Sequence, residues 1–525
     1  MWWPAALLLL VASLAPAAAV ATLWLLWARR PRTDVPGPPT LPLIGNAHLF
    51  WRLPVLMETF RQLQDRYGNT FRLYVGPKLL IFATEPDDVQ RVLMAKSLTH
   101  RDNFFVNAVT AFVGDGLLTT GGDQWRQHRR AVMPAFRTEA LKSFMASFNR
   151  NAARVCERLS ASAGAEVEPF PLLFLGSLDM GLRNLVGTPL EAVEPCPKRR
   201  AAFVGAMTRA MEIMQERIFQ PWLQLGWVLA LTKAGRDQGQ VVRLIADIMA
   251  ALLTPLFAPD SAGDHQPAKA SVLTEEEPLP EEEPLAEEEP LAEGRTPLVA
   301  ALSRSLRQHT LSHQEVMDEM RTLVVSGTDT TANTLVSALA LLSLHPEWQR
   351  AAHQELDHVF CRGSPDYHRD VTLEDVARLH VMDRILKETM RLFPVIFALP
   401  RALDAAVALR GGLVAPAGSS VVLVPYLTHR LAAHFPTPDR FDPDRFLPGG
   451  VCTSRHAYSY VPWGAGRRSC PGGRYAQLLM AALLAALLRR FAVLPACSRA
   501  DLEHIAVSVV QRPLRPVRLR FVPRD

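Results

Sequence analysis

The sequence predicts a mainly α-helical protein that carries small β-sheets. Runs typical of helices fill most of the chain, among them DQWRQHRRAVMPAF, QEVMDEMRTLVVSGTDTTANTLVSALALLSL and LLMAALLAALLRR. Strand-like runs are confined to two regions, 71–84, which turns at Gly76-Pro77, and 407–426, which turns at Gly411-Gly412. The length of 525 residues, taken alone, favours more than one domain.

The first 30 residues are typical of a membrane anchor. The segment 5–28 is almost entirely apolar and long enough to cross ~30 Å of hydrocarbon as a helix. A cleaved signal peptide is the alternative, because APAAA at 15–19 resembles a cleavage region. However, no Lys or Arg precedes the apolar run, and three arginines follow it at 29–32. We therefore expect residues 1–30 to form an uncleaved, single-pass transmembrane helix with the rest of the chain in the cytosol.

Residues 31–45 form a basic, proline-rich hinge. Its stretch VPGPPTLPLIG favours stiff, extended backbone, because proline lacks an amide donor and fixes φ. The body of the protein then runs from 46 to 525. Within the body, the segment 262–296 contains EEEPLPEEEPLAEEEPLAE, a six-residue repeat at 275–293 with ten glutamates and no Lys or Arg. Such a run repels itself and lacks apolar residues, so we expect it to be a disordered acidic insertion on the surface.

Charge and cysteine content exclude several classes of function. The chain has 57 basic and 52 acidic residues, and this small excess does not indicate a nucleic-acid partner. Its six cysteines are scattered along the chain without a CxxC pair. That pattern disfavours a disulfide framework or a zinc cluster and fits a reducing compartment.

The stretch WGAGRRSCPGGRYA, 463–476, places one cysteine between a glycine-rich loop and an apolar helix. Gly464 and Gly466 permit tight turns and a close approach of backbone to a flat ligand. Pro471 favours the first position of a helix, so the thiolate of Cys470 would face the positive end of the helix dipole. These features suit an anionic sulfur bound to a metal. The alternative for a single cysteine is a buried structural role.

With its flanking residues, this stretch resembles the haem-binding loop of cytochromes P450. The loop pattern Phe-x-x-Gly-x-Arg-x-Cys-x-Gly matches Trp463, Gly466, Arg468, Cys470 and Gly472, with tryptophan in place of phenylalanine. The resemblance covers roughly 36–520 and implies a single haem-thiolate domain with the cytochrome P450 fold, in place of the several domains that length favours. It also implies that Cys470 binds the iron of haem b.

Two further motifs match the family in order. Glu388 and Arg391 form an E-x-x-R pair on one helix face, and PDRFDPDRF at 438–446 follows it. By resemblance, Arg445 completes a structural network with this pair. The string SGTDTT at 326–331 interrupts an apolar helix with residues of poor helix propensity, so we expect a local opening of that helix.

The resemblance implies a role for the residues of these strings. Thr330 would interact with dioxygen and Asp329 would relay protons from water, although a threonine within a helix can also bond back to the carbonyl four residues earlier. Trp125 and Arg129 lie four residues apart on one helix face, in WRQHRRAVMPAF. With Arg401 and Arg468, they match positions that bind the haem propionates.

The function implied is the insertion of one oxygen atom of O₂ into a lipophilic substrate. Electrons would come from NADPH through a separate cytochrome P450 reductase, with cytochrome b5 as a second candidate donor. Two alternatives stay open: a P450-fold isomerase or dehydratase that needs no O₂, and a membrane-bound binder of apolar ligands without chemistry. The motifs look closest to the microsomal branch with the fatty-acid ω-hydroxylases, and the anchor places the protein at the endoplasmic reticulum membrane.

The haem is expected to be non-covalent. Many ω-hydroxylases of this branch carry a glutamate that forms an ester with haem, and Ser326 occupies that position here. The nearest glutamate on the same segment, Glu319, lies about two helical turns earlier. The substrate pocket is expected to take its walls from 103–120, 203–232, 320–330, 395–400 and 506–510, which are rich in apolar residues.

Overall fold

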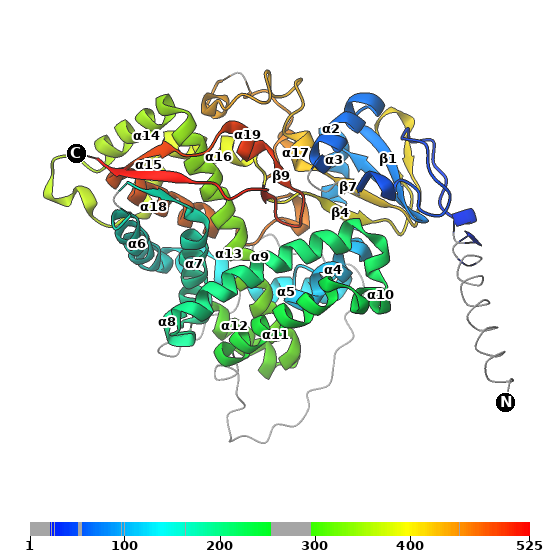
Figure 1. Ribbon diagram of the computed structural model, residues 1–525, viewed down its shortest axis with the longest axis horizontal. Coiled ribbons are helices and arrows are strands. Elements are labelled where there is room, and N and C mark those ends of the chain that lie inside the picture. The colour runs from blue at the N-terminus through cyan, green and yellow to red at the C-terminus, as the bar shows by residue number, and fades with distance from the viewer. Residues whose placement is uncertain are drawn as a thin grey trace.

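The computed structural model describes residues 22, 24–25, 27–50, 55–95, 97–98, 100–162, 164–253, 296–450 and 452–524. In this part of the chain, helices form most of the ordered structure and the sheets are small (Figure 1). The predicted fold class is therefore confirmed. A single large hydrophobic cluster extends along the sequence from Phe50 to Phe521.

The helices of the first half of the chain are α2 (Leu56–Tyr67), α3 (Pro86–Met94), α4 (Asn103–Val113), α5 (Gly122–Val132), α6 (Thr138–Ser160), α7 (Pro169–Gly181), α8 (Leu190–Val193), α9 (Pro197–Phe219), α10 (Gly226–Leu231) and α11 (Lys233–Leu253). Of these, α2 and α3 lie beside the largest sheet in Figure 1. The helices of the second half are α12 (Pro297–Arg307), α13 (His313–Leu344), α14 (Pro346–Val359), α15 (Leu373–Arg378), α16 (His380–Leu392), α17 (Pro425–Thr428), α18 (Gly473–Arg490) and α19 (Arg499–Glu503).

The largest sheet has the strand order β1-β2-β7-β4, with bounds Thr70–Val75, Lys78–Ala83, Ser420–Leu423 and Leu399–Ala402. Strands β1 and β2 form the predicted hairpin, in which Val75 pairs with Lys78 and Gly76 takes the positive φ of 57° that the turn requires. Strand β2 pairs in parallel with β7. This sheet lies at one end of the molecule, to the right in Figure 1, away from most of the helices.

The remaining strands form three smaller sheets. Strands β3 (Glu166–Val167), β11 (Leu519–Pro523) and β8 (Phe491–Pro495) make an antiparallel sheet. Strands β5 (Val407–Ala408) and β6 (Val414–Ala415) pair across the predicted turn at Gly411-Gly412, and β9 (Ile505–Ala506) pairs with β10 (Arg512–Pro513). The prediction from sequence missed every strand outside its two regions. Most of these are short. Strand β11 pairs with β3 and β8 across long stretches of sequence, whereas β9 and β10 lie close together in the chain.

Helix α13 runs through the middle of the protein. It begins at a capping box, in which the Ser312 side chain and the Glu315 side chain each bond the other residue's backbone amide. Most of its residues are buried, and it packs against α7, α14, α16 and α18. Because most of α13 is buried, the helix is held in the middle of the fold. Its side chains can therefore reach a site that residues of other elements also form.

The N-terminal predictions are tested only in part. Among the described residues, no helix is long and apolar enough to cross a membrane. Most of the predicted anchor at 1–30 lies outside the described residues, as does the acidic insertion at 262–296 apart from Thr296. The hinge is described: residues 31–40 contain no helix, as expected, and Val35 is buried. Its backbone lies along β1, where the Arg72 amide donates to the Pro36 carbonyl at 2.8 Å.

Candidate functional site

The loop before α18 holds Cys470 in a tight, glycine-dependent turn. Gly464 and Gly466 both have a φ of 66°, and a side chain at Gly466 would start 2.3 Å from the Leu93 carbonyl oxygen. The Cys470 amide donates to the Trp463 carbonyl at 2.9 Å, which closes the loop. Helix α18 begins at Gly473, so the prediction that Pro471 occupies the first helical position is wrong by two residues.

Two opposite effects act on the pKa of the Cys470 thiol. Burial disfavours the thiolate, whereas nearby donors and positive charge favour it. Although the residue is exposed, the protein encloses its sulfur closely enough that burial raises the pKa of the thiol. The Gly472 amide and the positive charge of Arg129 act in the other direction. A metal ion that binds the sulfur displaces its proton, so the raised pKa does not prevent coordination.

The tryptophan that replaces the family's phenylalanine packs onto the start of α18. A Cβ at Gly473 would lie 3.4 Å from the Trp463 ring, so the indole lies in van der Waals contact with this position. Trp463 thus keeps the position of an aromatic beside the cysteine loop.

Three predicted arginines converge in the interior and are joined by a fourth. Burial is the main cause that lowers the pKa of Arg401 to about 9 and of Arg468 to about 8. Repulsion from Arg101 adds to the effect on both, and Arg129 also repels Arg468. Burial likewise lowers the pKa of Arg101 to about 10. Four guanidinium groups therefore share one region, which we name the arginine cluster.

The arginine cluster is tied to the cysteine loop and to Trp125. The Arg468 guanidinium lies 4.6 Å from the centre of the Trp125 ring, a cation–π contact. Arg129 Nη1 donates to the Ser469 carbonyl at 2.6 Å, one residue before Cys470. The structure thus brings together the five residues that the sequence predicted as cofactor contacts.

The donor set of the arginine cluster fits a dianionic ligand. Among the described residues, no carboxylate forms an ion pair with Arg101, Arg129 or Arg401, and Arg101 Nε is buried without a hydrogen-bond partner. Buried cations are normally paired with an anion, so three arginines without a carboxylate partner in the described part of the chain indicate an anion-binding site. The two propionates of a haem would satisfy it, with Cys470 as the axial ligand.

Arg101 is the member of the arginine cluster that sequence analysis missed. It directly precedes Asp102, whose carboxylate caps α4 by accepting from the Phe104 amide at 2.9 Å. An arginine before a helix-capping aspartate, with polar residues such as His100 before it, is a weak local signal. Its approach to Arg401 and Arg468 depends on contacts across about 300 residues of sequence, which the local pattern does not contain.

The predicted opening of α13 at SGTDTT is wrong. The helix is continuous from His313 to Leu344. Hydroxyl and amide side chains bond to carbonyls four residues earlier, which keeps these poor helix formers within the helix. The bonds run from Thr328 to Val324, Thr330 to Ser326, Thr331 to Gly327, Asn333 to Asp329 and Thr334 to Thr330, at 2.7 to 2.9 Å.

Asp329 carries a carboxyl group that titrates close to neutral pH. Its side chain is almost fully buried, and Oδ2 has no hydrogen-bond partner. Burial raises the pKa of this carboxyl to about 6, although the charge of Arg512 and the amide of Asn333 partly oppose the rise. A buried acid with a pKa near the working pH is suited to proton transfer.

We expect Asp329→Asn to stabilise the fold at neutral pH. The folded state holds the Asp329 proton up to about pH 6, whereas an ordinary aspartate releases it near 3.8, so wild-type stability falls as the pH rises through this window. The neutral amide avoids this loss, which amounts to roughly 3 kcal/mol above pH 6 and vanishes near pH 4. Urea unfolding between pH 4 and 8 measures it. Asp375→Asn is the control of opposite sign, because hydrogen bonds from Arg369 and Thr372 lower the pKa of Asp375 in spite of its burial.

The predicted structural network is present and fully buried. Arg391 Nε and Nη2 bind the two carboxylate oxygens of Glu388 at 2.6 and 2.8 Å, and Arg445 Nε lies 3.4 Å from Glu388 Oε1. Arg391 also donates to the carbonyls of His429 and Arg440, at 3.0 and 3.1 Å. The network therefore ties α16 to the segment that leads into the cysteine loop.

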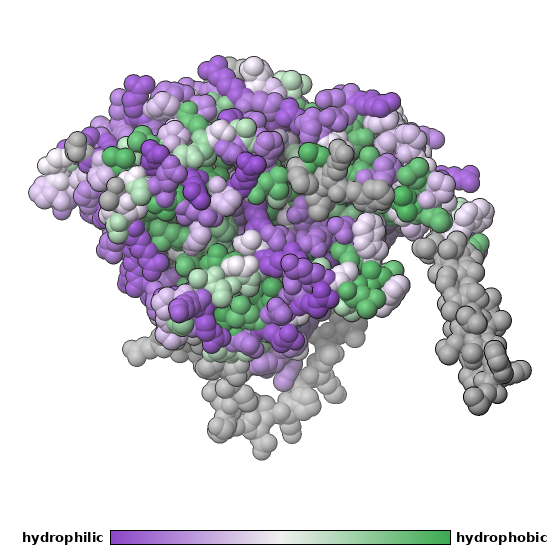
Figure 2. Space-filling view, in the orientation of Figure 1, coloured by the Kyte–Doolittle hydropathy of each residue, from purple (hydrophilic) through white to green (hydrophobic). Residues whose placement is uncertain are grey.

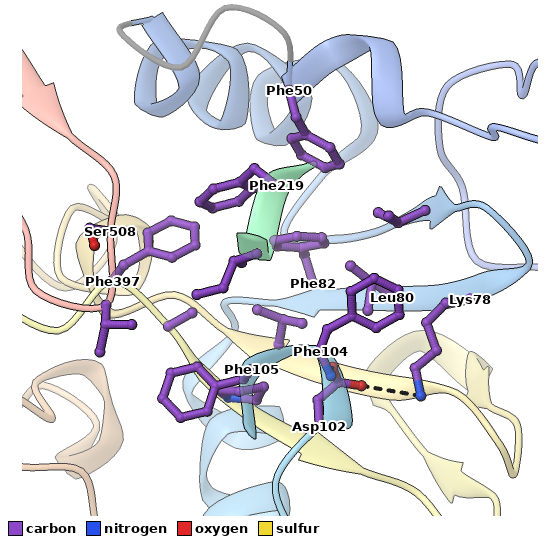
Figure 3. A pocket seen from close by; sticks show the side chains of 16 residues that line it. Phe50, Lys78, Leu80, Phe82, Asp102, Phe104, Phe105, Phe219, Phe397 and Ser508 are labelled. Atoms are coloured by element: carbon purple, nitrogen blue, oxygen red, sulfur yellow. Dashed lines mark hydrogen bonds and ion pairs between the residues drawn. The ribbon is translucent and has the colours of Figure 1, made fainter. Parts of the chain in front are cut away.

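A cavity lined mainly by apolar side chains lies between the β1–β2 hairpin, α4 and the end of α9 (Figure 3). The empty space among its lining side chains amounts to about 750 Å³ when the adjoining open solvent is included. Six phenylalanines line it: Phe50, Phe82, Phe104, Phe105, Phe219 and Phe397. Four of the five predicted wall segments contribute lining residues. The segment 320–330 contributes none, and the hairpin and β7 add walls that were not predicted.

One ion pair stands in this apolar cavity. Lys78 Nζ lies 3.1 Å from Asp102 Oδ2, as the dashed line in Figure 3 shows. Ser420 donates to the same carboxylate oxygen at 2.6 Å. Asp102 and Pro400 line the cavity, and each directly neighbours a member of the arginine cluster. The cavity therefore adjoins the region that fits the haem propionates.

Comparison with known proteins agrees with this arrangement. The family model for Cytochrome P450 matches residues 35–516. Cytochrome P450 4d2 of Drosophila melanogaster is 28% identical over 509 residues, which cover 96% of each chain. Cytochrome P450 4V2 of Mus musculus is 28% identical over 478 residues, covering 90% of this chain and 86% of the mouse protein. The match over most of its length, together with the site described above, shows that the chain belongs to the cytochrome P450 family and is a cytochrome P450 monooxygenase.

Proposed function

We propose that the protein oxidises a lipophilic substrate at the endoplasmic reticulum membrane, with NADPH electrons delivered by a separate reductase. The observation that carries the proposal is the apolar cavity, whose lining residues Asp102 and Pro400 directly neighbour Arg101 and Arg401 of the arginine cluster. Thiolate-bound haem activates dioxygen, so that one oxygen atom enters the substrate and the other leaves as water with two electrons and two protons. Apolar walls bind the substrate and exclude water from it.

The side chains of α13 are suited to supply the protons. Ser326, Gly327 and Thr330 are less buried than their neighbours on the helix, so one face of α13 is left more open here. The Thr330 hydroxyl donates to the Ser326 carbonyl at 2.7 Å and keeps its oxygen free to accept another hydrogen bond. With Asp329, whose pKa is near neutral, as its neighbour, we propose that Thr330 orients a proton donor for the reaction with dioxygen.

We expect Thr330→Ala to retain haem and substrate but to lose coupling. Without the hydroxyl, the group that donates protons to dioxygen is no longer oriented. Electrons from NADPH then form hydrogen peroxide in place of product. Product formed per NADPH should fall by roughly 100-fold or more, the range that general acid–base groups contribute. The measurement compares NADPH consumed, product and peroxide. Thr334→Ala is the matched control, since Thr334 makes the same type of back-bond one turn later. Unchanged coupling in Thr330→Ala would remove its proposed role.

The haem is proposed to be non-covalent. Ser326 provides no carboxylate, and Glu319 is fully buried with Oε1 2.7 Å from His128 Nδ1. Glu319 is therefore occupied on another part of the helix, about two turns from Ser326. We expect acid–organic extraction after turnover to release all haem from the polypeptide. Mass spectrometry of the extracted chain is the measurement, and a chain that retains the mass of haem would contradict the expectation.

The electron donor is proposed to dock beside the cysteine loop. Arg130 on α5 and Arg474 in the first turn of α18 are both exposed there. Positive side chains near the cofactor favour approach of an acidic partner. This supports a reductase as partner, with cytochrome b5 as a second donor.

Membrane attachment is supported by an exposed apolar surface as well as by the N-terminal sequence. Trp222, Leu225, Trp227 and Leu231 are 42%, 51%, 69% and 75% exposed, and they lie on or beside α10. Figure 2 shows the green patch that they form over this helix. Large apolar residues grouped on a surface mark an interface with another apolar phase or protein. We propose that this patch meets the membrane.

The test of function is oxygen incorporation. The full chain is reconstituted with an NADPH-dependent reductase in phospholipid vesicles and supplied with a panel of fatty acids, terpenoids, steroids and xenobiotics under ¹⁸O₂. We expect a product with one ¹⁸O atom that depends on NADPH, O₂ and reductase. A product that forms without NADPH and O₂ would instead indicate an isomerase or dehydratase.

A further inference from the structure

A buried histidine and glutamate join α5 to α13, and neither has a role in the function proposed above. His128 and Glu319 are both fully buried. His128 Nδ1 lies 2.7 Å from Glu319 Oε1, and its Nε2 lies 3.5 Å from Glu315 Oε1. Glu319 Oε2 is buried without a hydrogen-bond partner. We name His128 and Glu319 the buried His–Glu pair.

The contacts of His128 indicate an imidazolium. A neutral imidazole donates from only one ring nitrogen, whereas both nitrogens of His128 face carboxylate oxygens. Burial alone would lower the pKa of His128, but the hydrogen bonds and charges of Glu319 and Glu315 raise it above its ordinary value. The buried His–Glu pair is therefore a charge-assisted hydrogen bond, which is short and directional.

The buried His–Glu pair connects two helices, α5 and α13, and each of them carries residues of the proposed cofactor site. On α5, His128 directly precedes Arg129, and the buried Trp125 lies three residues earlier. On α13, Glu319 lies ten residues before Asp329, a distance of about 15 Å along the helix. The first turn of α13 is also held to α5 by a hydrogen bond from Gln124 Nε2 to Glu315 Oε1 at 3.1 Å. Sliding or rotation of either helix would break these bonds.

Stability alone is a weak explanation for such a pair. Enclosing two charges requires desolvation that their attraction only partly offsets, and Glu319 keeps one oxygen unpartnered. A directional bond can instead fix the register of two helices. Here the register of the two helices matters, because Arg129 donates to the Ser469 carbonyl and would also bind a propionate of haem.

We propose that the buried His–Glu pair holds α5 against α13 and so keeps Trp125 and Arg129 in position to bind the haem propionates. His128 and Glu319 are positioning residues, since they act through the α5 side chains. If either His128 or Glu319 is replaced, α5 can shift along α13. The propionate contacts then weaken, and the protein binds haem less tightly. The proposal rests on the haem cofactor, but not on the electron donor, the substrate or the membrane.

The test measures haem transfer from the haem-loaded full chain to excess apomyoglobin, without reductase, substrate or NADPH. The variants are His128→Gln, Glu319→Gln and the double variant, with the Soret spectrum and thermal midpoint of each. His353→Gln is the matched control, because His353 is a partly buried histidine on α14 outside the site. We expect each single variant to release haem about 10-fold faster, the equivalent of one charge-assisted bond, and the double variant no faster than the quicker single variant.

Several outcomes would overturn the proposal. They are an unchanged release rate in both single variants, an equal acceleration in His353→Gln, or a lower thermal midpoint without faster release. If His128→Gln does not fold, Glu319→Gln carries the test, because it removes the charge and keeps the size of the side chain. A negative result in the oxygen-incorporation experiment would not change the rates of haem transfer. The proposed function and the proposed positioning role can therefore be rejected independently.

Discussion

Cys470→His is expected to abolish monooxygenation, with product formation reduced at least about 100-fold, a barrier increase of ~2.7 kcal/mol or more. The cysteine loop places one sulfur beside the Gly472 amide and Arg129, and both favour an anion. A neutral imidazole supplies less electron density to the iron than a thiolate does. The reduced, CO-bound protein should therefore lose the Soret band typical of thiolate ligation, even where haem is retained.

Absorption spectra and product assays on the same preparation measure this result. Cys497→Ser is the control, because Cys497 is a partly buried cysteine beyond α18 without a predicted role. It should keep both the spectrum and the activity. A thiolate-type spectrum in Cys470→His would show that another group is the ligand.

Arg391→Met should lower the free energy of unfolding by ~3–5 kcal/mol. The substitution leaves the Glu388 carboxylate buried, with Arg445 at 3.4 Å as its nearest cation. It also leaves the carbonyls of His429 and Arg440 without their donor. Uncompensated burial of a charge is far more costly than loss of an exposed ion pair.

Urea unfolding of the haem-loaded protein is the measurement. Lys387→Met is the matched control on the same helix, because Lys387 pairs with Asp383 at 2.6 Å on the exposed face. That variant should change stability by less than ~1 kcal/mol. Equal effects for the two variants would mean that the buried network contributes no more than a surface pair.

Local patterns predicted the features that depend on neighbouring residues. The β1–β2 hairpin follows from a Gly-Pro turn between apolar runs, and the two arms pair in register from Thr70 to Ala83. The contact of Glu388 with Arg391 follows from helical spacing, since residues three apart share a face. Family motifs then placed Trp125, Arg129, Arg401 and Arg468 around Cys470. The structure groups these residues, while their roles remain predictions.

Features that depend on the path of the chain could not be predicted. Arg101 meets Arg401 because β7 carries β4 beside the segment before α4, and no spacing in the sequence encodes that approach. Phe50 and Phe82 also line the cavity, together with residues far from them in the sequence such as Phe219 and Phe397. The expected opening of α13 failed for a different reason. Propensity assigns threonine a cost in helices, but here each hydroxyl bonds a carbonyl one turn earlier.

Through the arginine cluster, the stability of the folded chain, and so its lifetime in a cell, depends on the supply of haem. Buried, mutually repelling cations raise the free energy of the folded state, and a dianion that binds them removes that strain. A ligand that binds only the folded chain stabilises it in proportion to the logarithm of its concentration. Newly made chains that meet no haem would therefore populate open forms more often and be removed sooner by cellular proteases. The amount of this protein in a cell would then follow haem synthesis, even with transcription unchanged.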